Sequence, residues 1–139
     1  MSYLTLQGLI DRYGEDELIQ LTDRAGDGVA DVAVVARAIA DAEAEIDAYL
    51  ANRMALPLAT VPAILERLAA AIVRHSLYKD AAPETVEKAR DAAIALLRDV
   101  SAGRASLGPS NDGAATPATA APSYSSVAPV FDDAGLAGY

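Results

Sequence analysis

The sequence predicts an all-α protein: a small bundle of three amphipathic helices with a short N-terminal helix, followed by an extended low-complexity tail. Three observations support this fold class. Apolar residues recur at steps of three and four along three stretches, as on one face of a helix. Alanine, the strongest helix former, supplies much of the 53% hydrophobic content. Aromatic residues make up only 5% of the chain, which is few for a β-sandwich.

The first helix is expected from about Leu6 to Tyr13. Thr5 precedes it as a suitable N-cap, and Gly14 follows it as a suitable stop. A short helical turn is expected next, over residues 15–21, because three acids stand in its first turn, where the helix dipole favours negative charge.

The second main helix is expected from about Val32 to Arg53, with Asp31 as its N-cap. The segment "LPLATVP" should end it, because neither proline suits a helix interior. One apolar stripe is predicted to face the core along this helix: Val32, Val35, Ile39, Ala42, Ile46, Tyr49 and Leu50.

Two more helices follow. Thr60 is expected to cap the third, with Pro62 in its first turn, and "DAAPE" should end it. The fourth is expected from about Glu84 to Ala102, with Gly103 as its stop. The predicted inward residues are Ile64, Leu65, Leu68, Ala71, Ile72 and His75 in the third helix, and Val86, Ala89, Ala93, Leu96, Leu97 and Val100 in the fourth.

Composition changes after these helices, so we expect a helical domain over residues 1–103 and a tail over residues 104–139. The tail consists mainly of Ala, Ser, Thr, Gly and Pro and includes four of the seven prolines. Such a segment buries too little apolar surface to offset its ordering entropy, and we expect it to be extended or disordered unless a partner orders it.

Charge and composition disfavour several functions. The net charge of −9 disfavours non-specific binding to DNA or anionic membranes. The chain has no cysteine and no nucleotide-binding or zinc-protease motif. His75 is the only histidine, and we interpret it as a packed residue at the core rim. The N-terminus lacks a signal-peptide pattern, and we expect synthesis in the cytoplasm. We predict no enzymatic activity and no cofactor.

The stretch "LTDRAGDGVAD" resembles half of a calcium-binding loop. With Asp23 at position 1 of an EF-hand loop, Asp27 falls at position 5 and Asp31 at position 9. Position 3 is Ala25, and Val34 replaces the bidentate glutamate of position 12. We therefore favour a turn that leads into the next helix. A weak, partly hydrated cation site is the alternative.

The second main helix carries another face, opposite its apolar stripe, formed by Ala33, Ala36, Ala40, Ala44, Ala48 and Ala51. Asp41 and Glu45 flank this face on one side, and Glu43 and Asp47 on the other. Two interpretations stay open: alanine tolerates solvent on a helix, or the face is a flat strip against which a neighbouring helix packs. The residues predicted for such a subunit contact are Ala40, Asp41, Ala44, Glu45 and Ala48.

The tail also has two interpretations. It is a flexible end, or it is a peptide that becomes ordered on a partner. The stretch "SYSSVAPVF" favours the second, because small polar and apolar residues alternate as in a segment that adds a strand to a sheet edge. The predicted anchors are Tyr124, Val127, Val130 and Phe131.

Four stretches in this order carry a family resemblance: "LIDRYGEDELIQLTDRAGDGVAD", "AEIDAYLANRMALPLATVP", "LYKD" and "LRDVSAGRASLG". Together they resemble the small helical proteins of Mu-like phages and prophages, over about residues 3 to 108. Those proteins are similar in architecture to the head–tail connectors, or neck adaptors, of long-tailed phages.

The resemblance implies a virion structural protein at the head–tail junction. Such adaptors form a ring, usually of twelve subunits, below the portal protein, and they meet a stopper or tail-completion protein. DNA passes through the ring without specific binding, and in several necks a C-terminal segment docks on the portal. Two other hypotheses remain: an acidic helical module that sequesters a basic partner, and a calcium-dependent regulator that uses Asp23, Asp27 and Asp31.

Overall fold

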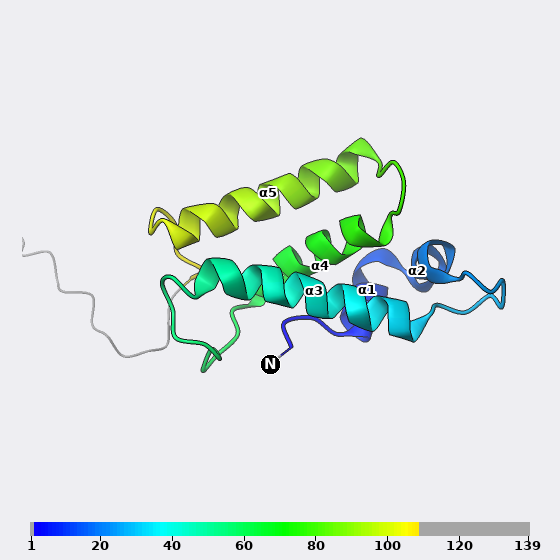
Figure 1. Ribbon diagram of the computed structural model, residues 1–139, viewed down its shortest axis with the longest axis horizontal. Coiled ribbons are helices and arrows are strands. Elements are labelled where there is room, and N and C mark those ends of the chain that lie inside the picture. The colour runs from blue at the N-terminus through cyan, green and yellow to red at the C-terminus, as the bar shows by residue number, and fades with distance from the viewer. Residues whose placement is uncertain (1, 109–139) are drawn as a thin grey trace, which may run out of the picture.

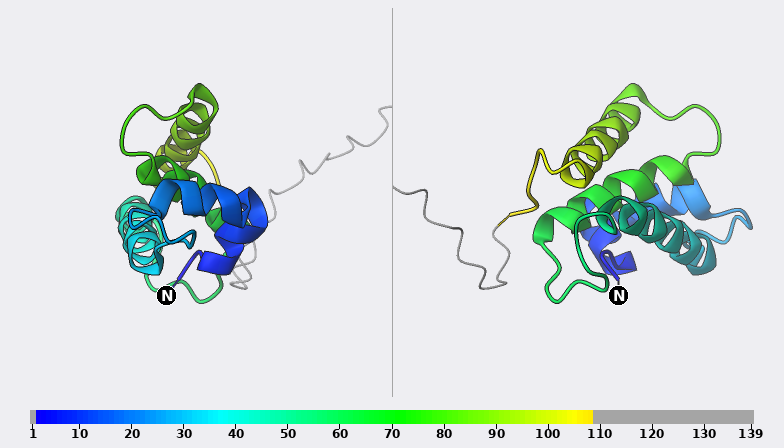
Figure 2. Two further views of the ribbon diagram at one scale, coloured as in Figure 1. Left: turned by 90° about the vertical axis from the view of Figure 1, so that its right-hand side faces the viewer. Right: turned by 60° about the vertical axis from the view of Figure 1, so that its left-hand side comes forward.

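The structure, a computed structural model, describes residues 2–108 and contains five helices in this range: α1 Leu6–Tyr13, α2 Glu15–Thr22, α3 Val32–Leu50, α4 Ala63–Leu77 and α5 Glu84–Ser101. No strand occurs among these residues. The helix α4 packs against both α3 and α5, which also contact each other, and the two short N-terminal helices lie away from α5 (Figures 1 and 2). The predicted all-α bundle is confirmed.

Local hydrogen bonds explain most helix boundaries. The Thr5 side chain accepts a hydrogen bond from the Gly8 N–H, and the Asp31 side chain accepts bonds from two N–H groups in the first turn of α3. Gly14 joins α1 to α2 at φ +86°, a conformation that a residue with a Cβ adopts only with strain. Three predicted features, the caps at Thr5 and Asp31 and the stop at Gly14, are therefore confirmed.

Other boundaries differ from the prediction. The helix α3 ends at Leu50 and not at Arg53, because the N–H groups of Arg53 and Met54 both bond to the Leu50 carbonyl and close a tight turn. The residue before α4 is Pro62 and not Thr60; its backbone is extended, and its carbonyl accepts from Leu65. Helix α5 ends at Ser101, one residue early.

The core contains most of the predicted inward residues, with two exceptions. Val32 is 60% exposed, because it lies in the first turn of α3 and faces an open groove. Ala89 is also exposed, at the edge of the α5 face whose buried residues are Val86, Ala93, Ile94, Leu97 and Val100. Leu107, four residues beyond the expected end of the helical domain, is buried in the core.

The central helix α4 is buried around most of its circumference. Its buried residues are Leu65, Leu68, Ala69, Ala70, Ala71, Ile72, Val73 and Leu77. The three consecutive alanines keep the helix narrow where α3 and α5 pack on it. Within residues 2–108, no helix has the length and apolar character needed to cross a bilayer.

Candidate subunit and partner surfaces

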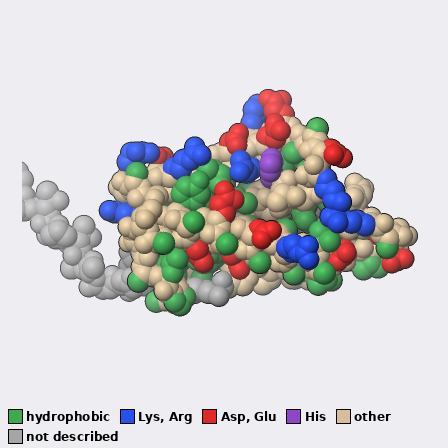
Figure 3. Space-filling view, viewed as in Figure 1, with side chains coloured by type: hydrophobic (Ala, Val, Ile, Leu, Met, Phe, Trp, Pro, Cys, Tyr) green, Lys and Arg blue, Asp and Glu red, His purple; other side chains and the backbone are tan. Residues whose placement is uncertain are grey.

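The outer face of α3 is uncovered in the single chain. Ala40, Ala44 and Ala48 are exposed, as is Asp41 beside them. The band where α3 crosses the front of the molecule shows acidic side chains interspersed with apolar ones (Figure 3). These residues form a flat strip without long side chains, which we call the alanine strip: Ala40, Ala44 and Ala48. Its role in subunit contact stays a prediction.

The acids predicted to flank the strip on one side differ in their surroundings. Glu45 is half-buried and lies 4.0 Å from the Arg90 guanidinium of α5, so part of its charge is used within the molecule. Asp41 is exposed and takes part in none of the ion pairs formed within residues 2–108. Of the two, Asp41 is the carboxylate that is open to a partner.

The acids on the other side of the strip hold the N-terminal segment. The Glu43 carboxylate accepts hydrogen bonds from the Ser2 hydroxyl and the Tyr3 N–H, both at 2.7 Å. The Tyr3 hydroxyl donates to the Asp47 carboxylate. Burial, together with this hydrogen bond, raises the pKa of Tyr3. No local sequence pattern predicts this contact, because it joins residues about 40 positions apart.

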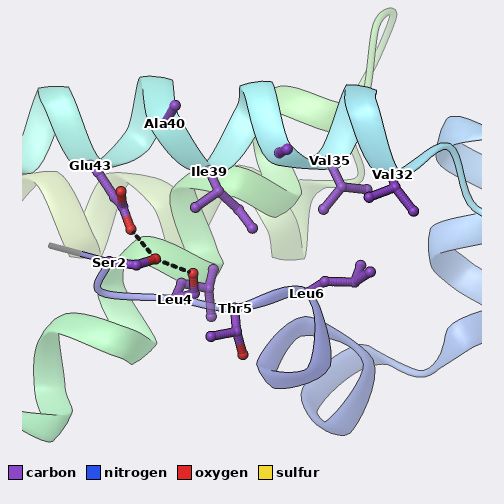
Figure 4. A pocket seen from close by; sticks show the side chains of 10 residues that line it. Ser2, Leu4, Thr5, Leu6, Val32, Val35, Ile39, Ala40 and Glu43 are labelled. Carbon is purple, nitrogen blue, oxygen red and sulfur yellow. Dashed lines mark hydrogen bonds between the residues drawn. The ribbon is translucent and has the colours of Figure 1, made fainter.

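A groove of about 350 Å³ lies between this N-terminal segment and α3. Val32, Val35 and Ile39 project from α3 toward Leu4 and Leu6 of the N-terminal segment (Figure 4). The full lining consists of Ser2, Leu4, Thr5, Leu6, Val32, Val35, Ala36, Ile39, Ala40 and Glu43. We call this cavity the α3 groove. It shares Ala40 with the alanine strip.

The acidic stretch before α3 forms a turn that wraps around its own carboxylate. Asp23 accepts hydrogen bonds from the N–H groups of Gly26, Asp27 and Gly28, at 2.7 to 3.1 Å. The bond from Gly28 is the largest cause of a lowered pKa at Asp23, and the other backbone donors add to it. Asp31 is occupied in capping α3. Within residues 2–108, no three carboxylate or histidine side chains are arranged to hold a metal ion.

Arg74 of α4 links the central helix to both short helices. Its Nε lies 2.6 Å from the Glu17 carboxylate of α2, and its guanidinium lies over the Tyr13 ring of α1, 4.5 Å from the centroid. Burial alone would lower the pKa of Arg74, but the hydrogen bond and charge of Glu17 raise it. Burial raises the pKa of Tyr13. This cluster is a structural contact between elements and was not predicted.

Two further predicted positions can be placed. His75 is half-buried near the end of α4, which agrees with its interpretation as a rim residue. The tail anchors Tyr124, Val127, Val130 and Phe131 lie outside the described residues.

Comparison with known proteins places the chain in a family. The sequence profile described as "Bacteriophage Mu, Gp36" matches residues 3–126. The Mu-like prophage FluMu protein gp36 of Haemophilus influenzae is 38% identical over 110 residues, which cover 79% of this chain and 78% of that protein. Gene product J of Escherichia phage Mu is 35% identical over 118 residues, which cover 84% of each chain. The predicted resemblance to proteins of Mu-like phages is confirmed, and the match extends beyond Gly108. The chain belongs to the bacteriophage Mu gp36 family.

Proposed function

We propose that this chain is a virion structural protein, the head–tail connector of a Mu-like phage particle. It forms a ring below the portal protein, usually of twelve subunits in comparable necks, and joins the head to a stopper or tail-completion protein. The family membership supports a phage role, and the uncovered alanine strip is the observation that carries the connector role. The mechanism is assembly, without bond chemistry.

A closed ring needs two different lateral surfaces on each subunit. The alanine strip can supply one, because three exposed alanines one turn apart let a neighbouring helix approach closely. The exposed Asp41 beside the strip adds a charge that can select a basic group on the neighbour. Because Glu45 is drawn toward Arg90, it contributes less to this contact than Asp41.

The net charge and the C-terminal tail bear on the passage of DNA and on attachment to the portal. The net charge of −9 suits a channel that DNA must traverse without being held by its phosphates. Tyr124, Val127, Val130 and Phe131 of the tail dock on the portal. Because many copies attach at once, individually weak tail contacts hold collectively.

The test replaces one alanine of the strip. Ala44→Arg places a long charged side chain in the contact, while Ala95→Arg places it on the exposed face of α5 as a matched control. In sedimentation with the portal protein of the same phage, we expect the wild type and Ala95→Arg to bind as multi-copy rings. Ala44→Arg should retain its helical circular dichroism and bind at least about tenfold more weakly, because it loses the collective contribution of its neighbours. Equal binding by both variants would contradict the proposal.

A second candidate function is also supported by the charge of −9: an acidic module that sequesters a basic protein. It predicts a complex with one or two copies of this chain. It also predicts that Ala44→Arg has no larger effect than Ala95→Arg. The same sedimentation experiment therefore separates the two functions by stoichiometry.

A further inference from the structure

The α3 groove is an apolar surface that lacks a cover within residues 2–108. Leu4 and Val35 form its buried floor, and Ile39 and Leu6 form half-buried walls. Val32 stands at one end of it with 60% of its surface exposed. Val29, three residues earlier in the turn that precedes α3, is 63% exposed. These two are the large hydrophobic side chains left exposed in the described part of the chain, so exposed apolar surface is concentrated here.

The polar groups of the groove are already engaged. The Glu43 carboxylate, the one ionisable group of the groove, accepts a hydrogen bond from the Ser2 hydroxyl (Figure 4). It accepts a second from the Tyr3 N–H. The Ser2 hydroxyl donates one of these bonds. A charged ligand therefore finds no free counter-charge in the groove, and the fitting occupant is a short, uncharged, apolar segment. At about 350 Å³ the groove holds a few side chains, toward the small end of protein binding sites of about 300–1,000 Å³.

The chain itself contains such a segment. Residues Tyr124–Phe131 carry no charge and include Tyr124, Val127, Val130 and Phe131. The described chain ends at Gly108, directly after the buried Leu107 and near the C-terminal end of α3 (Figure 1). Helix α3 has 19 residues and is about 28 Å long. The roughly 16 residues between Gly108 and Tyr124 span about 50 Å when extended, which is enough to reach the groove.

We propose that, in the free protein, residues Tyr124–Phe131 of the same chain occupy the α3 groove. The same chain is favoured over a second copy, because a short linker gives the segment an effective concentration in the millimolar range. A second copy at micromolar concentration competes poorly with it.

This occupancy has a consequence for assembly, and the consequence rests on the proposed function. Ala40 belongs both to the α3 groove and to the alanine strip, so a segment in the groove partly covers the lateral contact. Free chains then stay apart. When the portal takes the tail, Ala40 is uncovered, and neighbouring subunits pack. Ring formation is thereby restricted to the portal.

The first test uses the absence of cysteine from the natural chain. Ala36→Cys in the groove is combined with Val127→Cys, and separately with Val130→Cys, so that either register of the segment is sampled. Ala48→Cys with the same tail substitutions is the matched control, because Ala48 is exposed on the same helix outside the groove. During oxidation at micromolar protein, we expect the groove pairs to form an intramolecular disulfide about tenfold faster than the control pairs. Equal rates, or mainly disulfide-linked dimers, would overturn the proposal.

The second test uses the absence of tryptophan. In the full-length chain carrying Phe131→Trp, we expect a blue-shifted emission, because the indole is shielded from water. Adding Ala36→Glu should shift the emission to the red without changing the helical circular dichroism, since Ala36 is exposed and tolerates a larger side chain. Emission typical of an exposed indole that does not respond to Ala36→Glu would contradict the proposal. Neither test includes the portal, so their failure leaves the proposed connector function standing.

Discussion

Alanine is used in opposite ways in α3 and α4. In α4, Ala69 and Ala70 are fully buried, and the small side chains let two long helices approach the central one. In α3, Ala42 also faces the core, but Ala40 and Ala44 are exposed. The same residue type therefore shapes the interior of the molecule in one helix and leaves a bare surface on the other.

The difference comes from the neighbours of each alanine along the sequence. In α4, Leu68 and Ile72 lie on either side of the alanine run, so apolar side chains surround the whole helix. In α3, Asp41 interrupts the alanines and keeps that face in water. The charged residues beside the strip keep it hydrated in a single chain. A second chain can still pack against the exposed alanines.

The largest expected effect tests this contrast directly. Ala70→Leu should lower the free energy of unfolding by about 3 kcal/mol, at the upper end of overpacking costs, because the adjacent Ala69 and Ala71 leave no space into which the helix can relax. The matched change Ala44→Leu should alter it by less than about 0.5 kcal/mol, because the side chain extends into solvent. Urea unfolding followed by circular dichroism measures both values.

Two outcomes would break the comparison. If Ala44→Leu destabilises the single chain as much as Ala70→Leu, the strip is already covered in the free protein. If Ala70→Leu is tolerated, the centre of the bundle is loosely packed, and the alanines of α4 are not needed for close approach.

The sequence predicted the helices well. It predicted less well where some helices end and which of their residues are exposed. Caps and stops act within a few residues, so Thr5, Gly14 and Asp31 could be assigned from local chemistry alone. The end of α3 could not, because it depends on a turn at Leu50 that no glycine or proline marks. Val32 fits the apolar stripe by spacing, but its exposure depends on where the N-terminal segment lies.

For the candidate surfaces, the local sequence pattern predicted which residues are exposed but not which long-range contacts they make. Periodicity correctly placed the alanines opposite the apolar stripe, and the structure shows them exposed. Periodicity also placed Glu43 and Asp47 beside the strip, but it could not reveal that they bind Ser2 and Tyr3. The α3 groove is formed by that long-range contact, so no local sequence pattern predicts it.

A smaller loss of stability is expected when the polar contacts of α4 with the two short helices are removed. Arg74→Met removes the ion pair with Glu17 and the contact with the Tyr13 ring. We expect a loss of about 1–2 kcal/mol, because a half-buried carboxylate loses its charged hydrogen-bond donor. Arg12→Met is the matched control: its pair with Glu66 also joins a short helix to α4 but is longer and more exposed. The control should cost less than about 1 kcal/mol. Equal losses in thermal unfolding would show that burial does not decide the strength of these pairs.

The smallest effect concerns the turn before α3 and depends on pH. Hydrogen bonds from the N–H groups of Gly28 and its neighbours lower the pKa of Asp23 from its ordinary value of 3.8. A carboxyl group whose pKa is lower in the folded state stabilises the protein above the ordinary pKa and loses this contribution as the pH falls through the folded-state value. Asp23→Asn, which cannot ionise, should therefore be slightly less stable than the wild type near neutral pH and equal to it in strong acid.

Asp27→Asn is the control, because the Asp27 carboxylate accepts none of the turn's hydrogen bonds. Urea midpoints measured from about pH 7 to about pH 2 would reveal this convergence. A difference that persists in acid would mean that the shape of the side chain, and not its charge, holds the turn. A calcium-induced gain in stability that Asp23→Asn abolishes would instead favour the regulator hypothesis, because the carboxylate would then serve a cation as well as the backbone.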